Sequence, residues 1–80
     1  MDDQIGKVVH YYDKIGVAVV KLDKKLKVGD KVKLTYGEDS FEQQVSSMQL
    51  DHKPINEGSR GDEVAIKVDK SAKEGTVVVR

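Results

Sequence analysis

Residues 31–45 read KVKLTYGEDSFEQQV, and they alternate in polarity on both sides of a turn at residues 36–40. Before the turn, apolar or aromatic side chains occupy every second position, at Val32, Leu34 and Tyr36. After it, the alternation resumes with Phe41, Gln43 and Val45. A period of two is typical of strands that bury one face and leave the other in water. This segment therefore predicts two β-strands.

The rest of the chain repeats this pattern in short β-branched runs that glycine and aspartate separate. The runs cover residues 5–12, 17–22, 64–68 and 76–79. Residues 13–16, between the first two runs, end in Gly16, which predicts a hairpin loop with a positive φ. No stretch repeats apolar residues at helical spacing. The chain is therefore predicted to be all-β.

Two stretches depart from the simple alternation. Met48 and Leu50 have the opposite parity to Val45, which predicts a β-bulge near Ser46-Ser47. Residues 51–60 contain a proline and a glycine and form the longest stretch predicted to be irregular, with Ile55 as its inward anchor.

Glycine-led turns recur at three places, Gly29-Asp30, Gly61-Asp62 and Gly75-Thr76. Each is too short to indicate a duplication, so we expect them to be equivalent solutions to the same turn. Six short strands in 80 residues leave little room for two full sheets, and an open sheet leaves two unpaired edges. Closure removes both edges. We therefore predict one domain over residues 1–80, folded as a small closed six-stranded antiparallel β-barrel.

Charge and composition narrow the functional classes. Lys plus Arg and Asp plus Glu both total 14, so no global field attracts nucleic acid. The absence of cysteine excludes disulfides and thiolate metal sites. The acidic start, residues 1–4, lacks the features of a signal peptide, and no apolar run approaches the roughly 20 residues that span a bilayer. A cytoplasmic protein with no membrane partner is expected.

The motifs of common enzymes are missing. His10 and His52 have no further ligand at metal-site spacing, and no serine lies in a Gly-x-Ser-x-Gly elbow. No Gly-x-x-x-x-Gly-Lys-Ser/Thr loop is present to hold phosphates. We therefore expect a binding protein rather than an enzyme, with no catalytic residues, no metal or nucleotide site, no GTP and no cofactor.

A group of lysines is the best candidate for a phosphate-contacting surface, because lysines on neighbouring strands and turns can face one groove. They are Lys21, Lys24, Lys25, Lys27, Lys31 and Lys33. The alternative is a charged edge that discourages strand aggregation. Tyr11 and Tyr12 are consecutive, so on a strand they point to opposite faces and one is exposed. Tyr12 joins the candidate RNA-binding set, since an exposed aromatic ring can stack on a base.

The order of these segments resembles the β-barrel second domain of the translational GTPases, which follows the nucleotide-binding domain in elongation factor Tu. The matching segments lie in one colinear order at residues 5–8, 15–20, 26–32, 45–48, 55–66 and 74–78. The small C-terminal barrel of collagenase-like peptidases looks similar as well, above all through residues 41–45 and the Pro54-Ile55 loop. Both resemblances imply one type of barrel, elongation factor Tu domain 2-like, and two different functions.

The first resemblance implies a stand-alone, non-catalytic translation-factor-like barrel that binds tRNA, ribosomal RNA or a translation protein through its lysine-rich surface. The loop at residues 13–16 is less glycine-rich than in that family, and the segment 48–58 looks longer than in elongation factor Tu, so the tRNA pocket is not carried over. The second resemblance implies a protein-interaction accessory domain that is unrelated to translation. Salt-insensitive binding to a protein favours the second, because phosphate contacts release counterions and weaken with salt.

Overall fold

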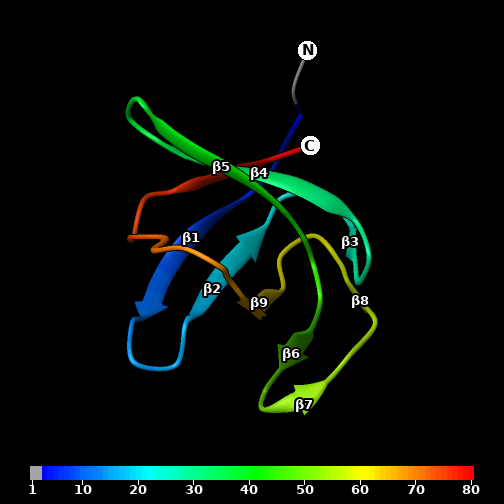
Figure 1. Ribbon diagram of the computed structural model, residues 1–80. Coiled ribbons are helices and arrows are strands. Elements are labelled where there is room, and N and C mark those ends of the chain that lie inside the picture. The colour runs from blue at the N-terminus through cyan, green and yellow to red at the C-terminus, as the bar shows by residue number, and fades with distance from the viewer. Residues whose placement is uncertain (1–2) are drawn as a thin grey trace.

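The computed structural model describes residues 3–80. Met1 and Asp2, which belong to the predicted domain and to the predicted absence of a signal peptide, lie outside the described residues. The described chain forms ten β-strands and no helix (Figure 1). The strands are β1 (Gln4–Tyr12), β2 (Val17–Leu22), β3 (Leu26–Lys27), β4 (Lys31–Tyr36), β5 (Asp39–Gln44), β6 (Met48–Leu50), β7 (Lys53–Pro54), β8 (Glu57–Gly58), β9 (Glu63–Lys67) and β10 (Val77–Val79).

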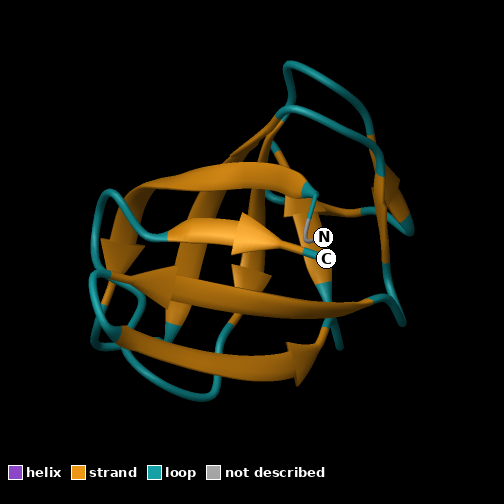
Figure 2. Cartoon of the chain, turned by 90° about the horizontal axis from the view of Figure 1, so that it is seen from above, coloured by secondary structure: helices purple, strands orange, loops and turns teal. Residues whose placement is uncertain are grey.

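Eight of the ten strands form one antiparallel sheet in the order β5-β4-β10-β1-β2-β9-β6-β7. The short strands β3 and β8 pair separately. The large sheet curves around a common interior (Figure 2), and the first and last described residues, Asp3 and Arg80, lie side by side. The backbone groups of Asp3 and Arg80 exchange hydrogen bonds there, at 2.9 and 3.2 Å. The N- and C-terminal segments are thus fastened together at one side of the curved sheet.

The prediction of an all-β fold is confirmed, but the prediction of a closed six-stranded barrel is wrong. The sheet ends at β5 on one side and at β7 on the other, and these two edges do not pair.

The predicted bulge at Ser46-Ser47 is instead a break, because β5 ends at Gln44 and β6 begins at Met48. The stretch 51–60, predicted to be irregular, contains β7 and β8. Pro54 is tolerated in β7 because this strand is at the edge of the sheet.

A side chain takes the place of the missing strand pairing. The amide of Gln43, on edge strand β5, donates to the carbonyl of Lys67 at 2.8 Å and accepts from the backbone N–H of Asp69 at 2.9 Å. Lys67 is the last residue of β9. Among the described residues no backbone ladder connects β5 with β9, so the Gln43 side chain provides the link between these two strands. Only 6% of Gln43 is exposed. The sequence pattern assigned this residue correctly to the inward face.

The core consists of the inward-facing aliphatic side chains of all the long strands. Val32, Leu34 and Val45, which the alternation predicted to face inward, are each 1% exposed. Burying a side chain of this size contributes about 1.5–3 kcal/mol to stability. The fully buried aliphatic residues also include Ile5, Val8, Ala18, Val20, Leu22, Leu26, Met48, Val64, Ile66 and Val78. Ile55 packs against this core as predicted.

The glycine-led turns share one geometry, as expected. In each, glycine has φ between 90° and 99°, the value that the third residue of a type II turn requires. In two of them the aspartate that follows accepts a hydrogen bond from the first residue of the turn, Asp30 from Lys27 N–H at 3.0 Å and Asp62 from Ser59 N–H at 2.9 Å. The third turn has Thr76 at this position, with the same backbone bond to the carbonyl of Lys73.

The loop between β6 and β7 has an unfavourable sequence for its conformation. Asp51 and His52 both have positive φ, 52° and 64°. A two-residue hairpin loop with two positive φ angles is a type I′ turn, which prefers Asn-Gly.

We expect His52→Gly to stabilise the protein by about 1 kcal/mol, because glycine adopts this conformation without the side-chain clash. In a domain of this size the gain corresponds to a rise in melting temperature of about 4–8 °C, measurable by calorimetry. Asp13→Gly in the other hairpin loop is the control, since Asp13 is not among the residues with positive φ. An equal gain in both variants would contradict the explanation.

We expect Gln43→Ala to lower the free energy of unfolding by about 2 kcal/mol, because it leaves the carbonyl of Lys67 and the N–H of Asp69 unpaired. Gln44→Ala removes one exposed hydrogen bond, to the carbonyl of Gly29, and should cost about 0.5 kcal/mol. Urea denaturation of both variants measures the difference. Equal losses would mean that Gln43 does not hold β5 to the end of β9.

Candidate functional site

The six candidate lysines lie on β2, in the bend and the strand β3 that follow it, and on β4. Lys21 lies on β2, opposite Glu63 of β9. Lys24, Lys25 and Lys27 follow in the bend after β2 and in β3. Lys31 and Lys33 are exposed on β4, on the face that the alternation predicted. A shallow depression of about 270 Å³ contains only two of the six, Lys25 and Lys27, together with Asp30 and Arg80.

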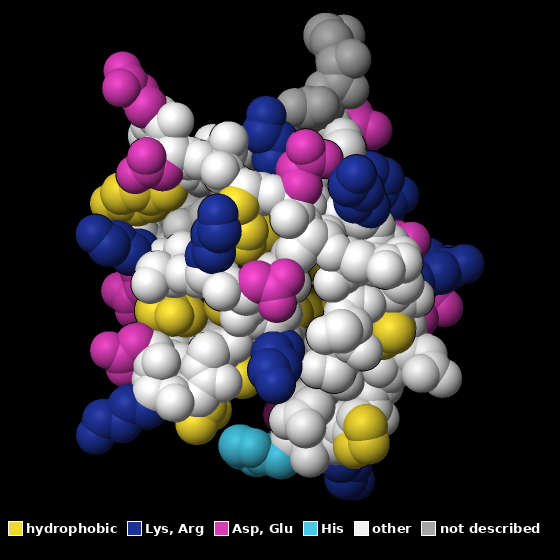
Figure 3. Space-filling model, viewed as in Figure 1, with side chains coloured by type: hydrophobic (Ala, Val, Ile, Leu, Met, Phe, Trp, Pro, Cys, Tyr) yellow, Lys and Arg dark blue, Asp and Glu magenta, His cyan; other side chains and the backbone are white. Residues whose placement is uncertain are grey.

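Carboxylates neutralise much of this positive charge. Lys25 Nζ lies 2.9 Å from Glu57 Oε1, and Lys24 and Lys31 are each 3.7 Å from a carboxylate oxygen, of Asp3 and Glu42 respectively. The hydrogen bond from Lys25 lowers the pKa of Glu57, and the same bond raises the pKa of Lys25. Figure 3 shows basic and acidic side chains interspersed on one face of the molecule. The grouping of these lysines as one binding surface stays a prediction.

The two consecutive tyrosines point to opposite faces, as predicted. Tyr11 packs against the core, and Tyr12 is 48% exposed. Tyr12 borders a groove of about 390 Å³ on the outer face of the sheet, which we call the outer-face groove. Its lining residues are Tyr12, Ile15, Val17, Val19, Gln49, Asp51, His52, Glu63 and Ala65.

The floor of the outer-face groove is apolar because β2 and β9 carry apolar residues on both faces. Ala18 and Val20 of β2 point into the core, and the alternate residues Val17 and Val19 point outward. Val19 pairs with Ala65 of β9, which is also directed outward. A strand that faced only water here would carry polar residues at these positions. Ile15, in the adjacent loop, is 64% exposed and extends the apolar surface.

The two histidines lie near this groove without forming a metal site. His10 Nδ1 is 3.4 Å from Glu74 Oε1, and the His10 ring packs edge-on against Tyr12 with centroids 4.2 Å apart. His52 is in the strained β6–β7 loop at the border of the groove. Within residues 3–80, no group of three His, Cys, Asp or Glu residues is placed to hold a metal ion. In the same part of the chain there is also no helix that could cross a membrane.

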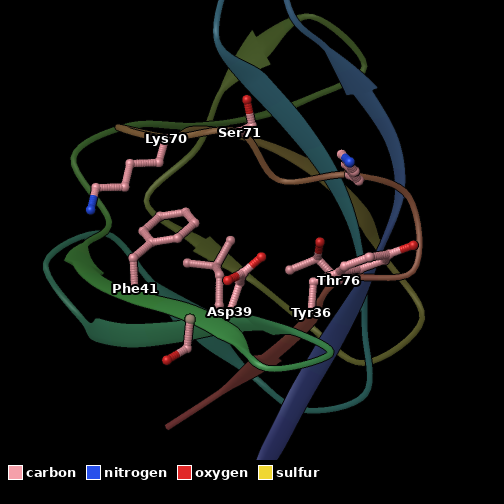
Figure 4. A pocket seen from close by; sticks show the side chains of 9 residues that line it. Tyr36, Asp39, Phe41, Lys70, Ser71 and Thr76 are labelled. Carbon is pink, nitrogen blue, oxygen red and sulfur yellow. The ribbon is translucent and has the colours of Figure 1, made fainter.

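A second cavity, the mouth pocket, opens at one end of the curved sheet. It has a volume of about 410 Å³ and is lined by Leu34, Tyr36, Asp39, Ser40, Phe41, Lys70, Ser71, Lys73 and Thr76. These residues come from β4, from β5 and from the segment before β10 (Figure 4). Tyr36 and Phe41 continue the inward-facing positions of β4 and β5 to the point where the core ends. The pocket is therefore the open end of the interior of the sheet.

Thr76 is the exceptional residue of this pocket. It is 2% exposed, and its Oγ1 atom has no hydrogen-bond partner among residues 3–80. The aspartates at the equivalent position of the other two glycine-led turns accept a backbone N–H, whereas the Thr76 hydroxyl is directed into the pocket (Figure 4). A buried hydroxyl without a partner costs about 1–3 kcal/mol. Sequence analysis missed this pocket, although the exchange of Asp for Thr in the third turn was visible.

The proteins that the comparisons find similar to this chain are named as proteases or peptidases. The chain is 36% identical over 74 residues to an uncharacterised protease of Methanocaldococcus jannaschii; the match covers 90% of this chain and 18% of that protein. The chain thus spans less than a fifth of that relative's length. No protein-family model matches this chain.

Two solved structures share the fold, and both are of the C-terminal domain of a putative U32 peptidase from Geobacillus thermoleovorans. One has a TM-score of 0.89 at 17% identity and covers 98% of this chain and 99% of that chain. The other has a TM-score of 0.86 at 18% identity, with 95% and 89% covered. The fold is therefore that of this peptidase C-terminal domain.

These findings correct the function predicted first. The similar proteins are named as peptidases and not as translation factors, so the translation-factor and RNA-binding interpretation is wrong. The resemblance to the C-terminal barrel of collagenase-like peptidases agrees with the comparisons. The signal for it was in residues 41–45 and in the Pro54-Ile55 loop.

We expect Thr76→Val to stabilise the protein by about 1 kcal/mol, because valine fills the same space without an unpaired hydroxyl. Thermal unfolding measures the change. Thr35→Val is the matched control on β4, since Thr35 is only half-buried and its hydroxyl is not among the buried unpaired atoms; its effect should stay within about 0.5 kcal/mol. A Thr76→Val variant that is less stable than the parent would contradict the assignment.

Proposed function

We propose that the chain is a non-catalytic accessory domain that packs through its outer-face groove on the remainder of a peptidase-related protein. The similarity to a segment of a much longer protease supports this context. The observation that carries the proposal is the apolar floor of the groove, formed by outward-directed residues of β2 and β9.

The residues that line the groove indicate what kind of partner surface would pack against it. Val17, Val19 and Ala65 form the floor, and Ile15 and Tyr12 form one border. Exposed apolar surface of this kind, bordered by polar groups, marks protein interaction sites. Tyrosine is enriched in interfaces because its ring buries a large area and its hydroxyl keeps a polar contact.

The charged residues at the rim of the groove indicate a further property of the proposed partner surface. Asp51 and Glu63 both border the groove, together with His52. We therefore expect the partner surface to present an apolar patch next to lysine or arginine side chains. The apolar part supplies the affinity, and the charges set the orientation.

The test uses the Methanocaldococcus jannaschii relative from which the segment that matches this chain has been removed, after its cooperative unfolding has been verified. We expect the chain to bind this protein, and Ile15→Glu to weaken binding at least tenfold by placing a charge in the apolar interface. Calorimetric titration at low and high salt gives the dissociation constants. Binding should persist at high salt, because the apolar contact is not screened.

Val28→Glu is the matched control, since Val28 is an exposed valine that does not border the groove. It should leave binding unchanged within about twofold, well below the 1.4 kcal/mol that a tenfold change represents. Equal effects of Ile15→Glu and Val28→Glu, or the absence of any complex with the folded relative, would refute the proposal.

A further inference from the structure

The mouth pocket is separate from the proposed docking surface, because it shares no lining residue with the outer-face groove. Its volume of about 410 Å³ lies in the range of about 300–1,000 Å³ that is typical of ligand sites. It also contains a buried hydroxyl that lacks a partner, at Thr76. A pocket of this size with such a group is a candidate for ligand binding.

The polar groups that point into the pocket are acceptors for a cationic ligand. Figure 4 shows the carboxylate of Asp39 and the hydroxyl of Thr76 directed into the cavity, whereas the polar ends of Lys70 and Ser71 point away from it. Asp39 has no ion-pair partner within residues 3–80. A cationic group placed next to the Asp39 carboxylate would therefore be stabilised by it, and an anionic group there would be repelled.

Aromatic rings flank the same space. Phe41 lies on one side of the pocket and Tyr36 on the other (Figure 4). The face of an aromatic ring attracts an ammonium group within about 6 Å of its centroid. The protein itself shows this preference, since Lys73 Nζ lies 6.0 Å from the centroid of the Tyr36 ring. The ammonium group of Lys73 thus lies near the position that a ligand cation would prefer.

We propose that the mouth pocket binds a protonated amine on an aliphatic stem, either a lysine side chain of a peptide or a free alkylamine. The ammonium group donates to the Asp39 carboxylate and, once the side chains that cover it have moved, to the Thr76 hydroxyl, which gives the buried oxygen its missing partner. The aliphatic stem packs between Tyr36 and Phe41 and against Leu34 at the base of the pocket. Lys73 competes for the Tyr36 ring and moves aside when the ligand enters.

The experiment is a titration of the ¹⁵N-labelled chain followed by amide chemical shifts of residues 36–41 and 70–76. The probes are n-butylammonium, Nα-acetyl-lysine N-methylamide, a blocked pentapeptide with a central lysine, and n-butyrate as the anionic counterpart. We expect the three amines to shift these amides and n-butyrate to leave them unchanged. Stronger binding by the pentapeptide than by the free amine identifies a peptide as the source, and equal binding identifies the amine alone; both support the site.

Variants separate the site from general surface attraction. Asp39→Asn should weaken amine binding about tenfold, and Thr76→Val by about threefold or more, because each removes a hydrogen bond to a charged group. Lys73→Gln should tighten binding, since it removes the competing cation. Glu38→Gln is the matched control, because Glu38 is next to Asp39 in the same hairpin but does not line the pocket.

Three results would overturn the proposal. One is binding of n-butyrate at the same amides, with Lys73→Gln weakening it, because this would make the pocket an anion site. Another is an equal loss of amine binding in Asp39→Asn and Glu38→Gln, which would mean that only the local surface charge matters. The third is the absence of amide shifts around the pocket with all the amines. Thr76→Val and Asp39→Asn are informative only when folded, which the spectrum itself reports.

Discussion

The two hydrogen bonds of the Gln43 side chain join the edge strand β5 to the end of β9 and to the residue that follows soon after it. A sheet that curls but does not close leaves two rows of backbone groups that need partners. Gln43 satisfies one carbonyl and one N–H of the opposite segment, at Lys67 and Asp69. An amide side chain suits this task because it carries a donor and an acceptor, as a strand backbone does. The core behind it stays covered without a continuous ladder.

The incomplete closure also creates the mouth pocket. Gln43 joins β5 to Lys67 at the end of β9 and to Asp69; farther along, β5 and the segment before β10 form walls of a cavity. The residues that would fill the end of a closed barrel, Tyr36 and Phe41, flank this opening instead (Figure 4). The cavity and the unpaired hydroxyl of Thr76 are thus consequences of the same open seam.

The two surfaces of interest arise in different ways. The outer-face groove results from a sequence feature, because β2 carries aliphatic residues on both faces and cannot bury both in one core. The mouth pocket results from the arrangement of segments that are far apart in the sequence, residues 34–41 and 70–76. A protein interaction fits the first surface, and a small cationic group fits the second. An accessory domain with both can pack on a larger protein and keep an accessible ligand site.

The sequence by itself determined the all-β class, the positions of the longer strands, the inward side of β4 and β5 and the geometry of the glycine-led turns, because alternation and turn chemistry are local properties. It pointed correctly to Gln43 as inward-facing and to one exposed tyrosine. It failed on closure, and it could not show that Lys25 pairs with Glu57, which is distant along the chain. Only the tertiary structure decided which strands pair, which charges pair and where a cavity remains, since these depend on contacts between residues that are distant along the chain.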